Sequence, residues 1–310
     1  MSFNQIIAHE RAKTILRGTL KRNRVPSAVL FSGDEGIGKK LTAITYAKAL
    51  NCLEPVEGDC CDSCRACKKI DSGIHPDVTV VSPEKDEITI ENIRMIIEAL
   101  SWRPFEGKRK VFIIDDADAM NSNAANAFLK TLEEPPEGSL ILLVSSSPDR
   151  LPDTIKSRCA HIRFYPLPRH QCEKIVSPHL DQEKRDVILN SAMGRPGLAL
   201  SRDFTSERDR FMKILNNMID GTSKDGWGDK DEMKLWFEAF SIFLRDLAVF
   251  NITGQKSDLI YGQAHKKRDI KEILDAYQLI DSLKSTVDFN LNKSITWNYV
   301  SAIARQYISL

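Results

Sequence analysis

The sequence predicts an α/β fold in which a parallel β-sheet is covered by helices and is followed by two helical parts. Three observations predict this fold. A glycine-rich phosphate-binding loop separates an apolar run from a helical segment, further apolar runs alternate with amphipathic segments, and the strand signal fades after about residue 165. We therefore expect domains at 1–165, 166–204 and 205–310, with a loop between helices at 217–231.

Four short runs have the composition of strands buried on both faces of a sheet. They are continuous and rich in β-branched residues or leucine, which is typical of parallel sheets because helices cover both faces. Segments with apolar residues at three- and four-residue spacing lie between them and predict helices. The expected strands are 28–32, 77–81, 111–114 and 140–144, and the expected helices are 41–50, 89–100 and 124–132.

The overall composition excludes several classes of protein. With 310 residues, 42% hydrophobic and 28% charged, the chain is neither collagen-like nor disordered. Its 44 basic and 43 acidic residues give a formal charge of +1, so no global field draws it to DNA or to an anionic membrane. No apolar run is long enough for a bilayer span and the first residues lack a secretory pattern, so we expect a cytoplasmic protein with no membrane partner.

The phosphate-binding loop is formed by Gly33, Gly36, Gly38 and Lys39, which match G-x-x-x-x-G-K. Glycines let backbone N–H groups curl around phosphate oxygens at a helix N-terminus, and the lysine reaches the β- and γ-phosphates. The next residue should offer a hydroxyl to Mg²⁺, but it is Lys40. We therefore expect a degenerate site for ATP or ADP in which hydrolysis is weak or absent. The alternative is a glycine turn without a ligand.

Two acidic residues follow the expected strand 111–114. Asp115 stands where a P-loop ATPase holds Mg²⁺, and Asp116 stands where a longer catalytic glutamate is usual. The shorter side chain of Asp116 weakens a base that must come within hydrogen-bond reach. Thr42 cannot supply the missing hydroxyl, because two helical residues rotate the side chain by about 200°. Taken alone, the acidic pair could equally cap a helix.

A cysteine cluster predicts a structural metal site. Five of the seven cysteines fall within 16 residues, and four of them have the spacing C-x8-C-x2-C-x2-C, which suits one tetrahedral Zn²⁺. Cys60 could compete with its neighbour on spacing alone, and His75 is expected to be a loop residue. An iron–sulfur cluster and free thiols are the alternatives. The expected zinc ligands are Cys52, Cys61, Cys64 and Cys67.

Three stretches resemble the clamp-loader branch of the AAA+ proteins: residues 126–136, the serines 145–147 and residues 155–159. The resemblance covers residues 1 to about 200. It implies an AAA+ P-loop domain with a zinc insertion at 52–67, a small helical lid domain and, more weakly, a helical collar domain for oligomerisation. Within that branch the chain is similar to the delta-prime subunit family, because Lys40 replaces the hydroxyl residue of the hydrolysing gamma/tau subunits.

The resemblance implies a role for Arg158 as a finger that reaches the ATP site of a neighbouring subunit. Such a guanidinium stabilises charge that develops on the γ-phosphate. The resemblance also implies gamma/tau and delta subunits as partners, and contact with the sliding clamp and primed DNA through the assembled complex. Without the resemblance, Arg158 would be assigned to a surface salt bridge.

Two further positions are compared with the family pattern. Ser146 or Ser147 stands where the family senses the γ-phosphate, and neither is assigned. Gly197 stands where hydrolysing members have an arginine, while Arg195 comes two positions earlier. Two rival functions remain open: a hydrolysing gamma/tau-like or other AAA+ ATPase, and a zinc-stabilised DNA-binding module.

Overall fold

A computed structural model gives the fold. It describes residues 1–179, 185, 188–190, 192–201, 204–221, 227–254, 269–287 and 291–308. The described chain forms two compact units. The first unit contains Met1–Ile175 with Gly194–Leu198, and the second contains Val176–Met193 with Ala199–Leu310.

The first unit is built on a five-stranded sheet in the order β2-β3-β4-β1-β5, in which all neighbouring strands are parallel. The predicted parallel sheet is therefore confirmed. The strand β5 was not anticipated, because Ile162 is its one buried residue and an edge strand of this kind has no continuous apolar run. The strands are β1 Ala28–Ser32, β2 Val78–Val81, β3 Lys110–Ile114, β4 Ser139–Ser145 and β5 Ala160–Arg163.

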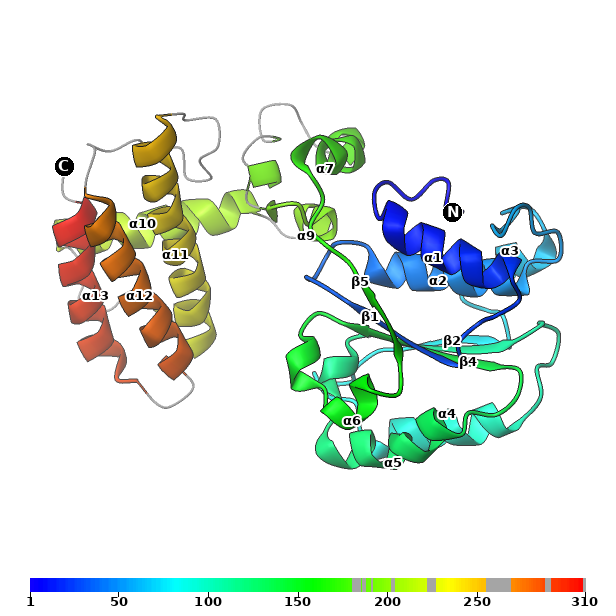
Figure 1. The fold of residues 1–310 in the computed structure, drawn as a ribbon. Coiled ribbons are helices and arrows are strands. Elements are labelled where there is room, and N and C mark those ends of the chain that lie inside the picture. Colours follow the sequence, from blue (N-terminus) through cyan, green and yellow to red (C-terminus); the bar gives the residue numbers. More distant parts are fainter. Residues whose placement is uncertain are drawn as a thin grey trace. The chain divides into compact units, whose positions relative to one another are not determined.

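Helices cover both faces of this sheet (Figure 1). Three of them, α1 Glu10–Lys21, α2 Lys39–Asn51 and α3 Arg65–Asp71, lie on one face. On the other face lie α4 Ile90–Ser101, α5 Ser122–Glu133 and α6 Asp153–Lys156. The remaining short elements are η1 Ala117–Ala119, η2 Pro148–Arg150, α7 Arg169–Val176, η3 Ser177–His179 and α9 Pro196–Ser201.

Local sequence fixes where α4 and α5 begin. Thr89 and Asn92 form a reciprocal capping box at the start of α4, and the side chain of Asn121 accepts the N–H of Ala124 at the start of α5. Both helices then bury one apolar face against the sheet, where each fully buried side chain contributes about 1.5–3 kcal/mol. The buried side chains of this core include Ile93, Ile96, Leu100, Phe112, Ile114, Phe128, Leu132, Ile141 and Leu143.

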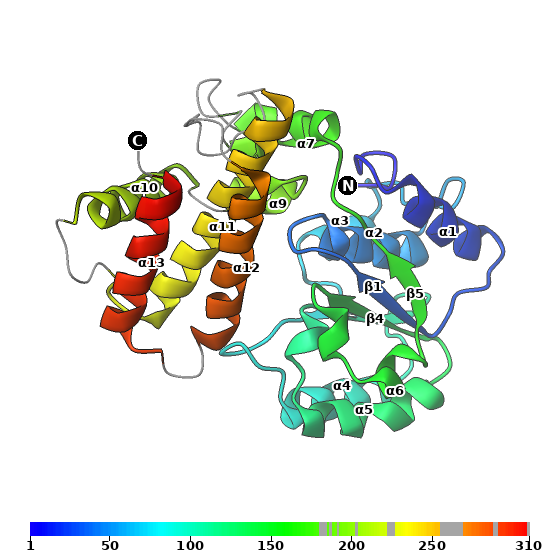
Figure 2. The same ribbon diagram turned by 60° about the vertical axis from the view of Figure 1, so that its left-hand side comes forward.

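Among its described residues, the second unit contains four long helices: α10 Phe204–Asp220, α11 Lys230–Thr253, α12 Ile270–Thr286 and α13 Lys293–Ile308 (Figure 2). Aromatic side chains fill its core, and the rings of Trp227 and Trp297 meet edge to face at 5.1 Å. The predicted loop at 217–231 is too long, because α10 continues to Asp220 and α11 begins after its N-cap Asp229. Residues 222–226 of that loop lie outside the described residues.

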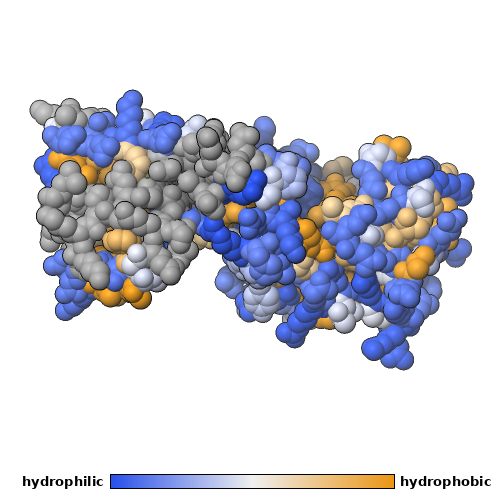
Figure 3. Space-filling view, turned by 90° about the horizontal axis from the view of Figure 1, so that it is seen from above, coloured by the Kyte–Doolittle hydropathy of each residue, from blue (hydrophilic) through white to orange (hydrophobic). Residues whose placement is uncertain are grey.

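On the face drawn in Figure 3, exposed apolar side chains are scattered among hydrophilic ones, as is usual for a protein surface. Within the described ranges, none of the helices combines the length and the apolar character that a bilayer span requires.

A buried carboxylate joins the segment before β2 to the segment before β3. Asp77, whose exposed fraction is 1%, accepts the backbone N–H groups of Phe105, Glu106 and Gly107 at 2.7–2.8 Å. Burial by itself raises the pKa of Asp77, but these three hydrogen bonds favour the ionised form and bring the pKa below its ordinary value. The ionised carboxylate therefore stabilises the folded chain at neutral pH.

We expect Asp77→Asn to lower the free energy of unfolding by about 1–3 kcal/mol at pH 7, because an amide NH₂ cannot accept these bonds. The contribution of Asp77 is present above its unfolded pKa of about 3.9 and is lost as the pH falls below that value. The wild-type chain should therefore lose more stability than Asp77→Asn between about pH 4 and pH 2. Urea unfolding at several pH values measures this, with the exposed Asp86→Asn as control; equal losses would contradict it.

Candidate functional site

The phosphate loop lies at the carboxyl end of β1 and leads into α2. Gly38 is the N-cap of α2 with φ of 99°, and in the described structure no side chain caps this helix. The first N–H groups of α2 therefore remain available for an anion. Gly33 and Gly36 also have positive φ, of 144° and 75°. These conformations are strained for residues with a Cβ, so the loop requires its glycines.

Close packing is a second reason why two of these positions require glycine. A Cβ on Gly33 would lie 2.5 Å from the carbonyl oxygen of Phe164, and a Cβ on Gly36 would lie 2.8 Å from the backbone nitrogen of Leu198. The loop is thus held between the residue that follows β5 and the start of α9.

The ammonium group of the loop lysine contacts the backbone of its own loop. Lys39 donates to the carbonyl oxygens of Gly33 and Asp34 at 2.6 Å each, and its exposed fraction is 6%. Burial lowers the pKa of Lys39, and the nearby carboxylates of Asp116 and Asp115 partly offset that effect. The structure therefore brings Lys39 and the glycines of the motif together in one loop.

The residue after the loop lysine makes the contact that decides whether Mg²⁺ fits. The Nζ atom of Lys40 lies 2.8 Å from Oδ2 of Asp115. In a P-loop ATPase these two positions supply a hydroxyl and a carboxylate to Mg²⁺. Here an ammonium group, which has no lone pair, is paired with the carboxylate. Residues for binding phosphate are therefore present, but the protein ligands do not fit Mg²⁺.

The other groups at this edge do not restore a magnesium site. The hydroxyl of Thr42 is buried and donates to the carbonyl oxygen of Gly38 at 2.9 Å, in keeping with the expectation that it cannot replace the missing ligand. Asp116 has a left-handed backbone conformation with φ of 46°. Burial raises the pKa of Asp116, and the carboxylates of Asp115 and Asp118 raise it further.

Serines at the end of β4 lie close to this edge. The backbone N–H of Ser146 donates to Oδ1 of Asp118 at 3.1 Å, which fixes the chain just after the strand. Ser145 pairs in register with Ser32, the residue before the loop, and is fully buried. Its hydroxyl oxygen finds no hydrogen-bond partner among the residues that the structure describes.

Two contacts to the loop, and one beside it, could not be read from the sequence. His9 Nε2 lies 2.7 Å from the carbonyl oxygen of Ile37, and its ring meets that of Phe164 edge to face at 4.9 Å. The N–H of Gly197 donates to the carbonyl oxygen of Gly36 at 2.7 Å. Each contact joins segments far apart in the chain, so no local pattern indicates it.

The contact of Gly197 leaves little room for a side chain at this position. A Cβ on Gly197 would lie 2.8 Å from the carbonyl oxygen and 2.9 Å from the Cα atom of Gly36. Both are backbone atoms, so a larger residue at position 197 would have to displace the loop.

Arg158 lies at the amino-terminal end of the parallel strands, whereas the phosphate loop lies at their carboxyl-terminal end. It precedes β5, whose first residue Ala160 pairs with Val29 near the start of β1, whereas the loop follows the end of β1. Strands rise about 3.3 Å per residue, so about 10 Å or more separate these two ends of the strands. Two nitrogens of Arg158 donate hydrogen bonds to the carboxylate of Glu133 at the end of α5. The bond from Nε is 2.8 Å long, and the second bond comes from Nη2. Its Nη1 donates to the carbonyl oxygen of Thr154 at 2.8 Å.

The four predicted cysteine ligands lie together. The sulfur of Cys52 is 3.5 Å from that of Cys61 and 3.7 Å from that of Cys67, and all four sulfurs lie within 4.8 Å of one another. Tetrahedral Zn²⁺ with bonds of about 2.3 Å separates its sulfur ligands by about 3.8 Å. The Ser63 hydroxyl and the N–H of Cys64 lower the pKa of Cys61 to about 6, which favours the thiolate that binds metals. The donor set therefore fits a metal ion.

Cys60 and His75 lie outside this group of sulfurs. The Cys60 thiol is directed to the carboxylate of Asp62 at 3.5 Å, and its N–H donates to Asp59. His75 accepts the N–H of Asp77 through Nδ1 at 3.1 Å. Among the described residues, the sulfur of Cys61, rather than that of Cys60, lies with the sulfurs of Cys52, Cys64 and Cys67.

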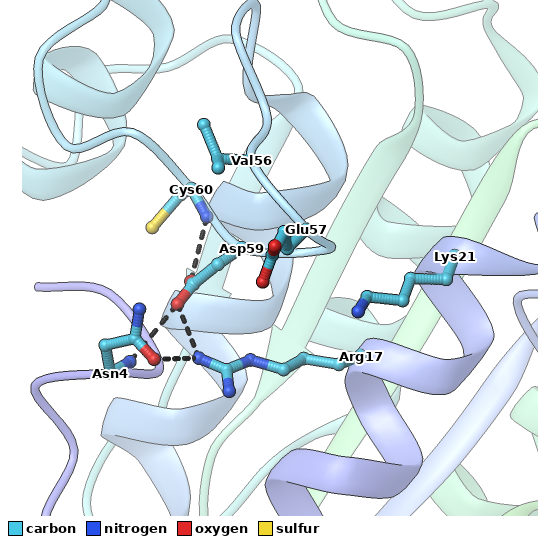
Figure 4. A pocket seen from close by; sticks show the side chains of 7 residues that line it. All are labelled: Asn4, Arg17, Lys21, Val56, Glu57, Asp59 and Cys60. Atoms are coloured by element: carbon cyan, nitrogen blue, oxygen red, sulfur yellow. Dashed lines mark hydrogen bonds and ion pairs between the residues drawn. The ribbon is translucent and has the colours of Figure 1, made fainter.

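Asp59 holds the cysteine segment against the N-terminal segment beside a small cavity of about 150 Å³ (Figure 4). Its carboxylate accepts hydrogen bonds from the guanidinium of Arg17, at 2.8 Å, and from the backbone N–H groups of Phe3 and Asn4. Burial raises the pKa of Asp59, but these donors outweigh it and lower the pKa below its ordinary value. The cavity is lined by Asn4, Arg17, Lys21, Val56, Glu57, Asp59 and Cys60.

The sheet order, the phosphate loop after β1 and the acidic pair after β3 define the class of this chain, which is a P-loop α/β protein of the AAA+ type. A solved structure of a gamma subunit-related protein of DNA polymerase III from Thermotoga maritima has the same fold, with a TM-score of 0.51. It is 18% identical and the likeness covers 94% of this chain and 98% of that one.

The family described as "DNA polymerase III, delta subunit" matches residues 8–168, and the chain belongs to this family. A curated relative, the delta' subunit of DNA polymerase III from Bacillus subtilis, is 33% identical over 81% of this chain and 80% of its own length. The gamma/tau subunit from Mycoplasma genitalium is 29% identical over 92% of this chain, which spans 44% of that relative. The predicted clamp-loader relationship is therefore confirmed at the level of the family.

Proposed function

We propose that this chain is the delta-prime-type subunit of a bacterial DNA polymerase III clamp loader. It helps the ATP-dependent loading of the sliding clamp onto primed DNA in the cytoplasm, and it does not hydrolyse ATP itself. The observation that carries this proposal is the ion pair between Lys40 and Asp115, 2.8 Å apart, in a phosphate loop that is otherwise complete. A gamma/tau-like ATPase needs Mg²⁺ at this place.

The position of Arg158 supports a role in trans. The side chain is partly exposed, with an exposed fraction of 31%, and lies at the end of the strands away from its own phosphate loop. Its pairing with Glu133, which is 48% exposed, costs little to break because such surface pairs contribute about 0–1 kcal/mol. The guanidinium can therefore exchange this carboxylate for a phosphate of a neighbouring gamma/tau-type subunit.

The cysteine group supports a structural role for Zn²⁺. Four thiolates leave no coordination position for water, so the ion would hold the segment between α2 and α3 and take no part in chemistry. Lys48 joins this segment to α2, because its buried ammonium lies 2.6 Å from Asp62 and 2.7 Å from Asp71. Beyond this insertion at 52–67 we propose the three-part division at 1–165, 166–204 and 205–310, with the last part as collar.

Reconstitution of the loader tests this function. The full chain is combined with gamma/tau-type and delta-type subunits, the sliding clamp and primed circular DNA. We expect the chain to enter the complex, and clamp loading to require it. Loading at the full rate in a mixture that lacks the chain would contradict the proposal, as would failure of the folded chain to bind the other subunits.

A further inference from the structure

The two groups that hold Mg²⁺ in P-loop ATPases are joined directly in this chain. Lys40 lies in the first turn of α2, and Asp115 is the residue directly after β3. Their charged atoms are 2.8 Å apart, and the side chain of Asp115 is largely buried, with an exposed fraction of 14%. The ammonium stands where a hydroxyl ligand is needed, and it pairs with the carboxylate that would be the second ligand. These two side chains therefore offer no pair of ligands to Mg²⁺. A positive charge nevertheless remains beside Asp115.

The ammonium of Lys40 has protons left for a second partner. It carries three N–H bonds, and the ion pair with Asp115 uses one of them. Its side chain is 48% exposed, so it can donate outward from the site while it stays paired with Asp115. Phosphate oxygens at the loop accept charge-assisted hydrogen bonds of this kind.

The remaining parts of a phosphate site are intact. Three glycines keep positive φ, Lys39 is directed into the loop, and the N-terminus of α2 has no capping side chain among the described residues. The hydroxyl of Ser145, on the strand beside the one that leads into the loop, is fully buried, and no described residue hydrogen-bonds it.

We propose that the ammonium of Lys40 takes the place of magnesium, so that this phosphate loop binds the phosphates of a nucleotide without a divalent cation. The inference deepens the nucleotide site of the proposed function. It assigns Lys39 and Lys40 as the two cations that neutralise the phosphates, with Asp115 orienting Lys40. One charge in place of two also leaves less stabilisation for a leaving phosphate, in keeping with binding without hydrolysis.

Calorimetric titration of the full chain with ADP, in EDTA and in Mg²⁺, tests the proposal. The wild-type chain should bind ADP in EDTA with a Kd within about threefold of that in Mg²⁺. A loss of about tenfold or more in EDTA, or no binding of ADP in either buffer, would overturn it.

Two variants test whether Lys40 is the cause. Lys40→Thr restores the hydroxyl and frees Asp115, so its binding of ADP should become at least about tenfold weaker in EDTA than in Mg²⁺. Asp115→Asn releases Lys40 and should bind ADP in EDTA at least as tightly as the wild-type chain. The exposed Lys130→Thr on α5 is the matched control and should bind as the wild-type chain does.

Binding by Lys40→Thr that is independent of Mg²⁺ would overturn the proposal. If that variant does not fold, Asp115→Asn decides: a loss of about tenfold in ADP binding in Mg²⁺ but not in EDTA is the behaviour of a metal ligand and would overturn the proposal. These titrations use the isolated chain, so their outcome is separate from reconstitution of the loader. A chain that binds ADP without metal but enters no loader would leave this inference standing and overturn the proposed function.

Discussion

In a clamp loader assembled with Arg158→Ala, we expect the ATP site of the neighbouring gamma/tau-type subunit to lose its hydrolysis, while the other ATP sites keep theirs. An arginine finger accelerates phosphoryl transfer by about 10³-fold or more, because its guanidinium stabilises charge as it develops on the γ-phosphate. Single-turnover hydrolysis by the reconstituted loader measures the loss, since the phase of the adjoining site should disappear. Assembly should be unchanged.

The stability of the chain distinguishes this role from a structural one. The bonds of Arg158 to Glu133 lie at a partly exposed surface, so Arg158→Ala should change the free energy of unfolding by less than about 1 kcal/mol. The exposed Arg150→Ala in η2 removes the same charge and is the matched control. If Arg158→Ala leaves every phase of hydrolysis at its wild-type rate, the finger assignment is wrong.

The second large effect concerns the cysteine segment. The purified chain should contain about one zinc ion, and the double variant Cys64→Ser with Cys67→Ser should contain none, because two thiolate ligands are lost. Free energies of zinc binding in small modules are about 10–16 kcal/mol, so the variant should also unfold at a clearly lower temperature. Elemental analysis and thermal unfolding measure the two results.

Cys60→Ser provides the control for this experiment. Its sulfur lies next to the group in sequence but is directed to Asp62, outside the four sulfurs that lie together. The variant should keep its zinc. A full zinc content in the double variant, or loss of zinc from Cys60→Ser, would show that the ligand set is wrong.

The sequence predicted those elements whose signal is local. The strands β1 and β3 were visible because both faces are buried and every position in the centre of the run is apolar. The sequence did not predict the strand β5, because it lies at the edge of the sheet and Ile162 is its one buried residue. The helix α1 was not anticipated either, since its polar residues outnumber the few that it buries.

The site divides in the same way. The glycines and Lys39 form one continuous motif, and the charge of Lys40 already indicated the loss of the metal ligand. That Lys40 pairs with Asp115 depends on the neighbouring positions of β1, β4 and β3 in the sheet, which the sequence does not give. The contact between Gly197 and Gly36 likewise depends on packing between distant segments.

The most direct measurement compares two reconstituted loaders, one with Lys39→Ala and one with Arg158→Ala in this chain, for their rate of ATP turnover. The account predicts that Lys39→Ala leaves turnover close to the wild-type rate while Arg158→Ala removes the adjoining site's share. Turnover that depends on Lys39 and is indifferent to Arg158 would contradict it.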